Sequence, residues 1–147
     1  KLYEANQAGV QVELCLRGNC SLIPDIPGYS EGLFINGIIS RYLEHSRIYI
    51  FGNGGDPRYF IGSTDWMSRN LDRRVEVMTP VYDPDIQQEL DFIVSAGLAD
   101  TEQGYHVRVS DVRPRRDDYP AGTPLFNSQQ ALYKYYLDRK QSENDHD

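Results

Sequence analysis

Hydrophobic and polar residues alternate over several short stretches of the chain, and this period of two is the pattern of β-strands. In the first stretch, Val12, Leu14 and Leu16 fall on one face. Strands are predicted over residues 11–16, 33–39, 47–51, 58–63, 75–82 and 105–112. The turn-forming run GNGGDP joins the third and fourth of these strands, which predicts a β-hairpin.

Two longer stretches, residues 83–100 and 127–140, carry hydrophobic residues at helical spacing. Asp83 stands where it can cap the first of these predicted helices. Asn127 or Ser128 is placed to cap the second. Strands that alternate with helices in this order predict an α/β fold with a mixed β-sheet flanked by helices.

A chain of 147 residues is long enough for one domain with a hydrophobic core. We expect a single domain over residues 1–137, followed by a polar, disordered tail over residues 138–147. No apolar run reaches the roughly 20 residues of a membrane span, and no charged-then-apolar leader suggests export. Cys15 and Cys20 are interpreted as reduced thiols of a cytoplasmic protein.

The net charge of −7 argues against a general nucleic-acid binder, because duplex binding depends on neutralising phosphates. Arginine nevertheless accounts for 12 of the 15 basic residues, and the lysines lie near the chain ends. Forked guanidinium groups match the geometry of phosphate oxygens. The body of the domain is therefore suited to bind anions through arginine, although a codon bias toward arginine would give the same composition.

His45 and Arg47 stand where the third predicted strand begins. Residues two apart in a strand project to the same side, so both side chains would face one volume of space. They would offer two cationic donors to a phosphoryl group, and His45 could give a proton to a departing oxygen. A capped strand end is the structural alternative. Of the other histidines, His106 is interpreted as a structural or surface residue, and His146 lies in the tail.

Further arginines are candidates for the same site. Arg17 ends a predicted strand and is followed by Gly18, which lets the backbone approach a ligand closely. Ligands of α/β sheets bind beyond the carboxyl ends of strands, although Arg17 could also be a surface residue. If Arg73 and Arg74 begin the next strand, their side chains have opposite sidedness, and at most one of them can face the site.

Long segments of the chain closely resemble the C-terminal part of bacterial polyphosphate kinases. These segments are LYEANQAGV, RGNCSLIPDIPGYSE and RYLEHSRIYIFGNGGDPRYFIGSTDWMSRNLDRRVEV. The resemblance runs from about Leu2 to Val81 and returns in the closing helix ALYKYYL. It implies that the chain is the C-terminal domain of a longer kinase, which reversibly transfers the terminal phosphate of ATP to inorganic polyphosphate through a phosphohistidine.

The family's two C-terminal domains each resemble half of a phospholipase D active site, which is marked by His-x-Lys, an aspartate and Gly-Ser-x-Asn. In His45-Ser46-Arg47 an arginine replaces the lysine, and in Gly62-Ser63-Thr64-Asp65 an aspartate replaces the asparagine. Gly52 occupies the position of the expected aspartate, and Asp56 follows four positions later. These departures count against phosphodiester hydrolysis and match the polyphosphate kinase variant.

The resemblance implies that His45 and Arg17 contact the nucleotide phosphates, with Arg47 and Arg74 as further phosphate-binding residues. The phosphorylated histidine and the Mg²⁺ ligands are expected outside this chain, so the isolated chain is predicted to be inactive. The expected partners are ATP or ADP, inorganic polyphosphate, the preceding domains of the same polypeptide and further copies in a homo-oligomer, but no nucleic acid. The expected location is the cytoplasm, with peripheral attachment to the inner membrane as a second expectation.

Two other functions stay open. A phospholipase D-like phosphodiesterase would pair two copies of this half-site by dimerising. A polyphosphate-binding module would bind its ligand through the arginines and would tolerate the loss of His45.

Overall fold

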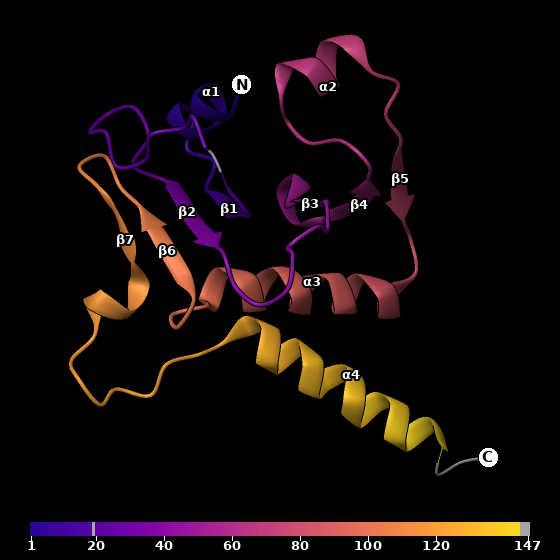
Figure 1. The fold of residues 1–147 in the computed structure, drawn as a ribbon. Helices are drawn as coiled ribbons and strands as arrows, with labels where there is room; N and C mark the ends of the chain where they lie inside the picture. Colours follow the sequence, from indigo (N-terminus) through magenta and orange to yellow (C-terminus); the bar gives the residue numbers. More distant parts are fainter. Residues whose placement is uncertain (19, 145–147) are drawn as a thin grey trace. The chain divides into compact units, whose positions relative to one another are not determined.

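The computed structural model describes residues 1–18 and 20–144 of the chain (Figure 1). Its internal contacts group the chain into two compact units. The first unit comprises Lys1–Glu44 and Ser95–Asp147, and the second comprises His45–Val94. Each unit has a β-sheet of its own, whereas the sequence pattern predicts one sheet within a single domain over residues 1–137.

A mixed four-stranded sheet with the order β1-β2-β6-β7 forms the centre of the first unit. Strand β1 (Val12–Leu16) runs parallel to β2 (Leu33–Ile38). Strand β6 (Gly104–Val107) is antiparallel to β2, and β7 (Val112–Pro114) is antiparallel to β6. The long loop 17–32 supplies the crossover that parallel strands require.

One hydrophobic cluster of the first unit lies on one face of this sheet. Val12, Leu33 and Ile35 are buried there, and the short helix α1 (Leu2–Gln7) contributes Leu2 and Tyr3 to the same cluster. Asn36 is fully buried within β2, and its amide nitrogen donates to the Gly97 carbonyl at 2.7 Å. This hydrogen bond ties β2 to the end of helix α3 (Pro84–Ala99), whose residues 95–99 belong to this unit.

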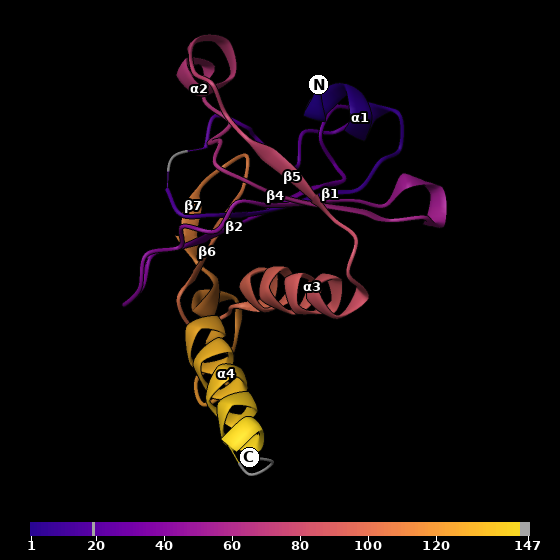
Figure 2. The same ribbon diagram turned by 90° about the vertical axis from the view of Figure 1, so that its right-hand side faces the viewer.

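Helix α4 (Ser128–Asn144) closes the first unit and runs away from the four-stranded sheet in both views (Figures 1 and 2). The Asn127 side chain accepts a hydrogen bond from the Gln130 backbone at 3.0 Å, so Asn127 is the cap among the two candidates, Asn127 and Ser128. The segment 138–144, expected to be disordered, continues this helix. It contains neither glycine nor proline, and most of its residues are good helix formers. His146 lies outside the described residues.

The second unit contains an antiparallel three-stranded sheet with the order β3-β4-β5. Its strands are Ile48–Phe51, Arg58–Gly62 and Met78–Val81. The predicted hairpin between β3 and β4 is confirmed, and the 3₁₀ turn Asn53–Gly55 connects the two strands. Gly54 adopts φ +65°, a conformation that favours glycine, which explains the glycine-rich turn.

Two helices accompany this second sheet. Helix α2 (Ser68–Arg73) connects β4 to β5, and residues 84–94 of α3 follow β5. Asp83 caps α3 as predicted, because its carboxylate accepts hydrogen bonds from the backbone of Asp85 and Ile86 at 2.9 and 3.2 Å. The buried Tyr59 of β4 donates its hydroxyl to Asp91 of α3 at 2.8 Å, so this helix packs on the sheet.

The predicted α/β class, with a mixed sheet and accompanying helices, is confirmed. One predicted strand, residues 105–112, is instead the hairpin of β6 and β7. The Arg108 backbone donates to the Asp111 carbonyl at 2.9 Å and closes this turn, so Ser110 and Asp111 act as turn residues. Within the described residues, no helix is both long and apolar enough to cross a membrane.

Candidate functional site

His45 and Arg47 lie in the extended segment directly before β3, which begins at Ile48 rather than at Arg47. The Gly62 backbone N–H donates to the Arg47 carbonyl at 3.0 Å, so the pairing with β4 continues one residue beyond the strand. This hydrogen bond fixes the Arg47 backbone. The two side chains meet as predicted, although His45 itself is outside the strand.

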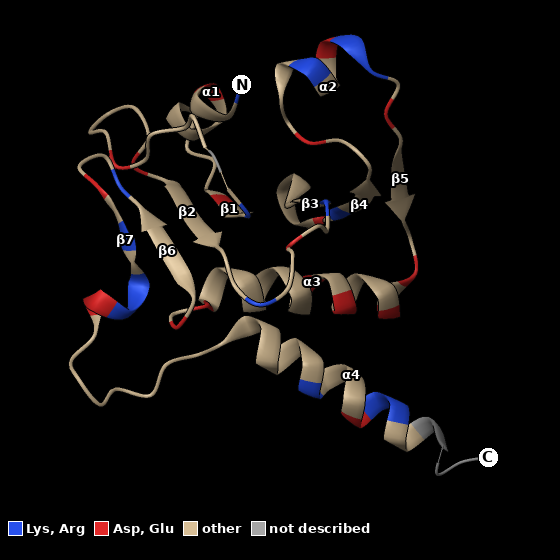
Figure 3. Cartoon of the chain, viewed as in Figure 1, with Lys and Arg blue, Asp and Glu red and all other residues tan. Residues whose placement is uncertain are grey.

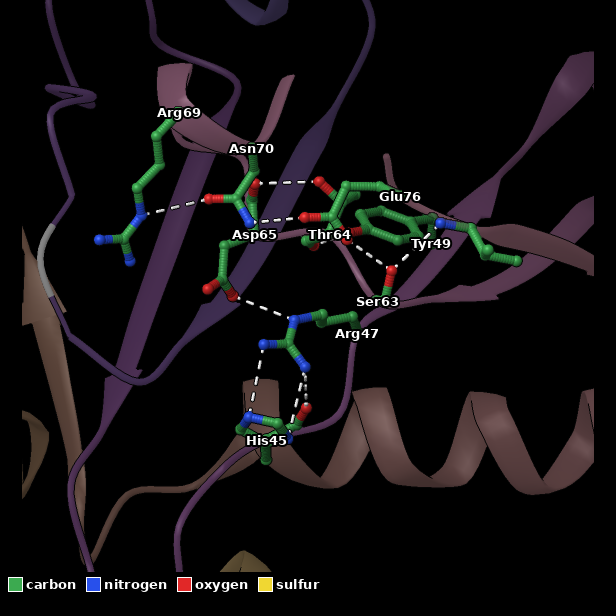
Figure 4. Close-up of polar contacts among 10 residues, drawn as sticks. His45, Arg47, Tyr49, Ser63, Thr64, Asp65, Arg69, Asn70 and Glu76 are labelled. Atoms are coloured by element: carbon green, nitrogen blue, oxygen red, sulfur yellow. Dashed lines mark hydrogen bonds and ion pairs between the residues drawn. The ribbon is translucent and has the colours of Figure 1, made fainter. Parts of the chain in front are cut away.

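The guanidinium group of Arg47 lies against the His45 imidazole (Figure 4). Its Nη1 is 3.3 Å from Nδ1 of the ring and donates to the His45 carbonyl at 3.2 Å, while Nη2 is 3.4 Å from Nε2. A guanidinium has only donors and a neutral imidazole has one acceptor nitrogen, so only one of the two ring contacts can be a hydrogen bond. A hydrogen bond at either ring nitrogen therefore has Arg47 as its donor.

Asp65 holds the opposite side of the Arg47 guanidinium. Arg47 Nε donates to Asp65 Oδ1 at 3.1 Å, and the two side chains are only 18% and 24% exposed. Partial burial makes such a pair stronger than a fully solvated one. Figure 4 shows Arg47 between Asp65 and His45. The three residues form a chain of carboxylate, guanidinium and imidazole.

The backbone around Asp65 is fixed by its neighbours. Thr64 is buried, and its carbonyl accepts a hydrogen bond from the Tyr49 hydroxyl at 2.6 Å. The Tyr49 ring stacks on Trp66 with a centroid distance of 5.5 Å and an interplanar angle of 12°. Burial raises the pKa of Tyr49 above its ordinary value of 10. Asp65 therefore stands between two anchored residues.

Glu76 joins the Gly-Ser motif to helix α2. Its two carboxylate oxygens accept hydrogen bonds from the Ser63 hydroxyl at 2.5 Å and from the buried Asn70 amide at 2.9 Å. These two hydrogen bonds, the Ser63 one first, hold the pKa of Glu76 below its usual value. Sequence reasoning missed Glu76 and the role of Asn70. The only signal was their partner Ser63, which belongs to the motif.

Arg74 does not begin a strand. It caps the C-terminal end of α2, where Figure 3 shows a group of basic residues, and β5 begins only at Met78. The opposite sidedness expected for Arg73 and Arg74 depends on their beginning a strand, and this condition is not met, because Arg73 is the last residue of α2. Arg74 is exposed, and its positive charge contributes to lowering the pKa of Glu76.

Arg17 follows the last residue of β1 directly, as predicted, and is exposed. It belongs to the first unit, whereas His45, Arg47 and Asp65 belong to the second. That Arg17 acts on the same phosphate as His45 stays a prediction.

His106 lies on β6 among charged neighbours. Arg108 Nε donates to its Nδ1 at 3.3 Å, and the Asp118 carboxylate lies 3.7 Å from the same nitrogen. Asp118 also pairs with Arg108 and Arg113. Burial first, and then the Arg108 charge, lower the pKa of His106. This ion-pair network agrees with the structural interpretation of His106.

The described part of the chain contains no group of three or more His, Cys, Asp or Glu side chains that could hold a metal ion. Cys15 and Cys20 are both free thiols. The His45–Arg47–Asp65 cluster of the second unit offers an oriented imidazole beside a fixed positive charge. Such an arrangement can stabilise negative charge and exchange a proton at the imidazole.

Comparison with known proteins places this chain in a family. A family model described as polyphosphate kinase C-terminal domain 2 matches residues 1–129. The polyphosphate kinase of Thermosynechococcus vestitus is 51% identical over 119 residues, which are 81% of this chain and 16% of that protein. The polyphosphate kinase of Escherichia coli K12 is 40% identical over 144 residues, which are 97% of this chain and 20% of that protein.

The fold agrees with the same assignment. A crystal structure of the polyphosphate kinase from Porphyromonas gingivalis matches with a TM-score of 0.86 at 35% identity, covering 96% of this chain and 21% of that one. The chain belongs to the polyphosphate kinase family and is a C-terminal domain of it. It spans about a fifth of the length of the relatives that it matches.

Proposed function

We propose that this chain is one half of a phosphotransfer site in a polyphosphate kinase. In the complete enzyme, a histidine outside this chain attacks the γ-phosphorus of ATP, and the resulting phosphohistidine passes the phosphoryl group to inorganic polyphosphate. The reaction is reversible. The observation that carries this proposal is the ordered contact between His45 and Arg47 in a chain of this family.

In this proposal His45 and Arg17 contact the phosphates of the nucleotide. Phosphoryl transfer is catalysed mostly by positioning and by electrostatic stabilisation, which these residues supply to the transferring group. Arg47 adds positive charge beside His45, and the exposed Arg74 is a further phosphate-binding candidate. An arriving phosphoryl dianion would compete for the Arg47 N–H groups that now face the imidazole and would favour a protonated His45. His45 could then donate a proton to a departing oxygen.

Other components come from outside the chain. Mg²⁺ is expected in the full-length enzyme, and its ligands are proposed to lie outside this chain. The proposed partners are ATP or ADP, polyphosphate, the remaining domains of the polypeptide and further copies of it. We place the enzyme in the cytoplasm or at the periphery of the inner membrane.

The decisive variant is His45→Ala in the full-length kinase that contains this domain. We expect polyphosphate synthesis from ATP to fall roughly 10²–10³-fold, because one charge-stabilising group is lost. His106→Gln is the matched control, since His106 also contacts an arginine two residues later and lies outside the proposed site. Near-normal synthesis by His45→Ala would overturn the proposal. Unchanged thermal unfolding would show that a loss of activity is not a loss of fold.

Three further assays separate the competing functions. Incubation of the isolated chain with labelled ATP should leave no acid-labile phosphate on the protein, and stable labelling of His45 would contradict the proposed division of roles. Cleavage of a chromogenic phosphodiester by a dimer of the chain would favour the phospholipase D-like half-site. Binding of tripolyphosphate, undiminished by His45→Ala, would favour a binding module.

A further inference from the structure

We infer that Asp65 is a positioning residue for His45 and that it acts through Arg47. The inference rests on the proposed function, because it assigns a supporting residue to the same site. Asp65 binds the Nε side of the guanidinium. The two Nη atoms are then directed at the imidazole, which they reach at 3.3 and 3.4 Å.

The planarity of the guanidinium explains how one carboxylate controls the ring. The three nitrogens of Arg47 lie in one rigid plane, so fixing Nε on Asp65 and the backbone carbonyl on Gly62 leaves the side chain little freedom. His45 itself precedes the strand and is exposed, so the strand pairing does not orient its ring. Among the described contacts of the His45 side chain, those with Arg47 fix the imidazole.

Asp65 is itself well placed for this role. Buried Thr64 precedes it, and the stacked Trp66 follows it. The Met67 backbone N–H donates to the Asp65 carbonyl at 2.8 Å. The carboxylate therefore offers Arg47 a fixed anchor rather than a mobile surface charge.

The sequence contains an independent sign of this coupling. Arg47 and Asp65 are the two positions at which the chain departs from the His-x-Lys and Gly-Ser-x-Asn pattern. The structure shows that these two departures are partners in one ion pair. Arg47 brings a planar guanidinium where the pattern has a lysine, and Asp65 brings a carboxylate where it has an asparagine. The two changes are complementary, because a guanidinium pairs well with a carboxylate. The negative charge of Asp65 also offsets the positive charge that Arg47 places beside the imidazole.

The test uses the full-length kinase, with kcat and the KM for ATP measured separately for each variant. Asp65→Asn should lower kcat about 10- to 100-fold, because the imidazole is no longer held in place. The KM for ATP should change little, and Asp65→Glu should recover part of kcat because it keeps the charge. Asp56→Asn is the matched control, since Asp56 pairs with Arg58 in the same unit but is exposed; it should leave kcat unchanged.

The coupling through Arg47 is tested by a double-mutant cycle. In an Arg47→Ala background, Asp65→Asn should lower kcat by less than about threefold, since its route to His45 is already lost. A full additional 10- to 100-fold loss would overturn the inference. If Asp65→Asn reduces the thermal unfolding temperature too far, Arg47→Lys provides the second test, because it leaves Asp65 in place and should show the same loss of kcat.

The outcome also separates this inference from the proposed function. If Asp65→Asn has the kcat of the wild type while His45→Ala is inactive, the positioning role of Asp65 is wrong and the proposed function still stands. Wild-type kcat in His45→Ala would remove the proposed function and the inference together.

Discussion

The Ser63 hydroxyl donates a 2.5 Å hydrogen bond to the Glu76 carboxylate across 13 residues of sequence. Asn70 of α2 binds the other oxygen, and the Val77 backbone returns a hydrogen bond of 3.1 Å to the Ser63 hydroxyl. One carboxylate thus connects the end of β4, helix α2 and the segment that leads into β5. This connection places the Gly-Ser motif in a fixed frame next to Asp65.

The Glu76 interaction predicts a dependence of stability on pH. The folded-state pKa of Glu76 is lowered from 4.5, so the ionised form contributes stability above pH 4.5, which is lost as pH falls through the folded pKa. Urea unfolding of Glu76→Gln should therefore show a smaller loss of stability than the wild type between pH 7 and pH 3. Ser63→Ala should give an intermediate slope. Equal slopes for the wild type and Glu76→Gln would contradict the assignment.

Local signals in the sequence were sufficient for much of the fold. The alternation around Val12 and Leu14 predicts β1, and Asp83 predicts the start of α3, because strand faces and helix caps depend on neighbouring residues. The β6–β7 hairpin was missed because its turn lacks glycine and proline. The division into two sheets depends on contacts between distant residues, which no local pattern contains.

In the candidate site, too, contacts between residues close in sequence could be predicted and contacts between distant residues could not. The proximity of His45 and Arg47 follows from their separation by two residues, and the sequence predicts it. The ion pair of Arg47 with Asp65 does not follow, because Asp65 is 18 residues away from Arg47 in the sequence. Glu76 carries no motif of its own and is recognised only through its hydrogen bonds.

A second prediction concerns the buried Asp100 carboxylate at the junction of α3 and α4. Its Oδ1 accepts three backbone hydrogen bonds, and its Oδ2 accepts the Ser128 backbone and hydroxyl at 2.8 and 2.6 Å. Asp100→Asn would leave buried donors unpaired and should lower the free energy of unfolding by about 2–4 kcal/mol. Ser128→Ala removes one of these bonds and should cost about 1 kcal/mol.

Chemical denaturation measures both changes, with Asp117→Asn as the control. Asp117 is exposed, so its substitution should change the free energy of unfolding by less than about 0.5 kcal/mol. A similar small effect of Asp100→Asn would show that this junction does not stabilise the first unit.

A third prediction concerns Tyr59, which joins β4 to α3. Its hydrogen bond to Asp91, followed by burial, raises the pKa of its hydroxyl above 10. The protonated form therefore contributes stability below pH 10, and this contribution is lost as pH rises through the folded pKa. Tyr59→Phe should cost about 1 kcal/mol at pH 7. In ultraviolet titration, the difference between wild type and Tyr59→Phe should show a group that ionises above pH 10, and a midpoint at or below 10 would contradict the assignment.

A fourth prediction concerns the close approach of α3 to β1 within the first unit. A Cβ added at Gly97 would lie 2.7 Å from the Cys15 sulfur, which is closer than packed atoms allow. Gly97→Ala should therefore lower the free energy of unfolding by about 1–3 kcal/mol, even though alanine favours a helix over glycine by about 1 kcal/mol. This clash of the added Cβ involves one side chain, Cys15, so a second substitution at Cys15 can relieve it.

Adding Cys15→Ala removes the sulfur and should reverse the effect of Gly97→Ala. The double variant should then be more stable than Gly97→Ala alone, because the helix propensity of alanine is no longer offset by the clash. Cys20→Ala is the matched control, since the Cys20 thiol is not among the atoms that the added Cβ would meet. Equal rescue by Cys20→Ala, or no rescue by Cys15→Ala, would mean that another contact limits the packing at Gly97.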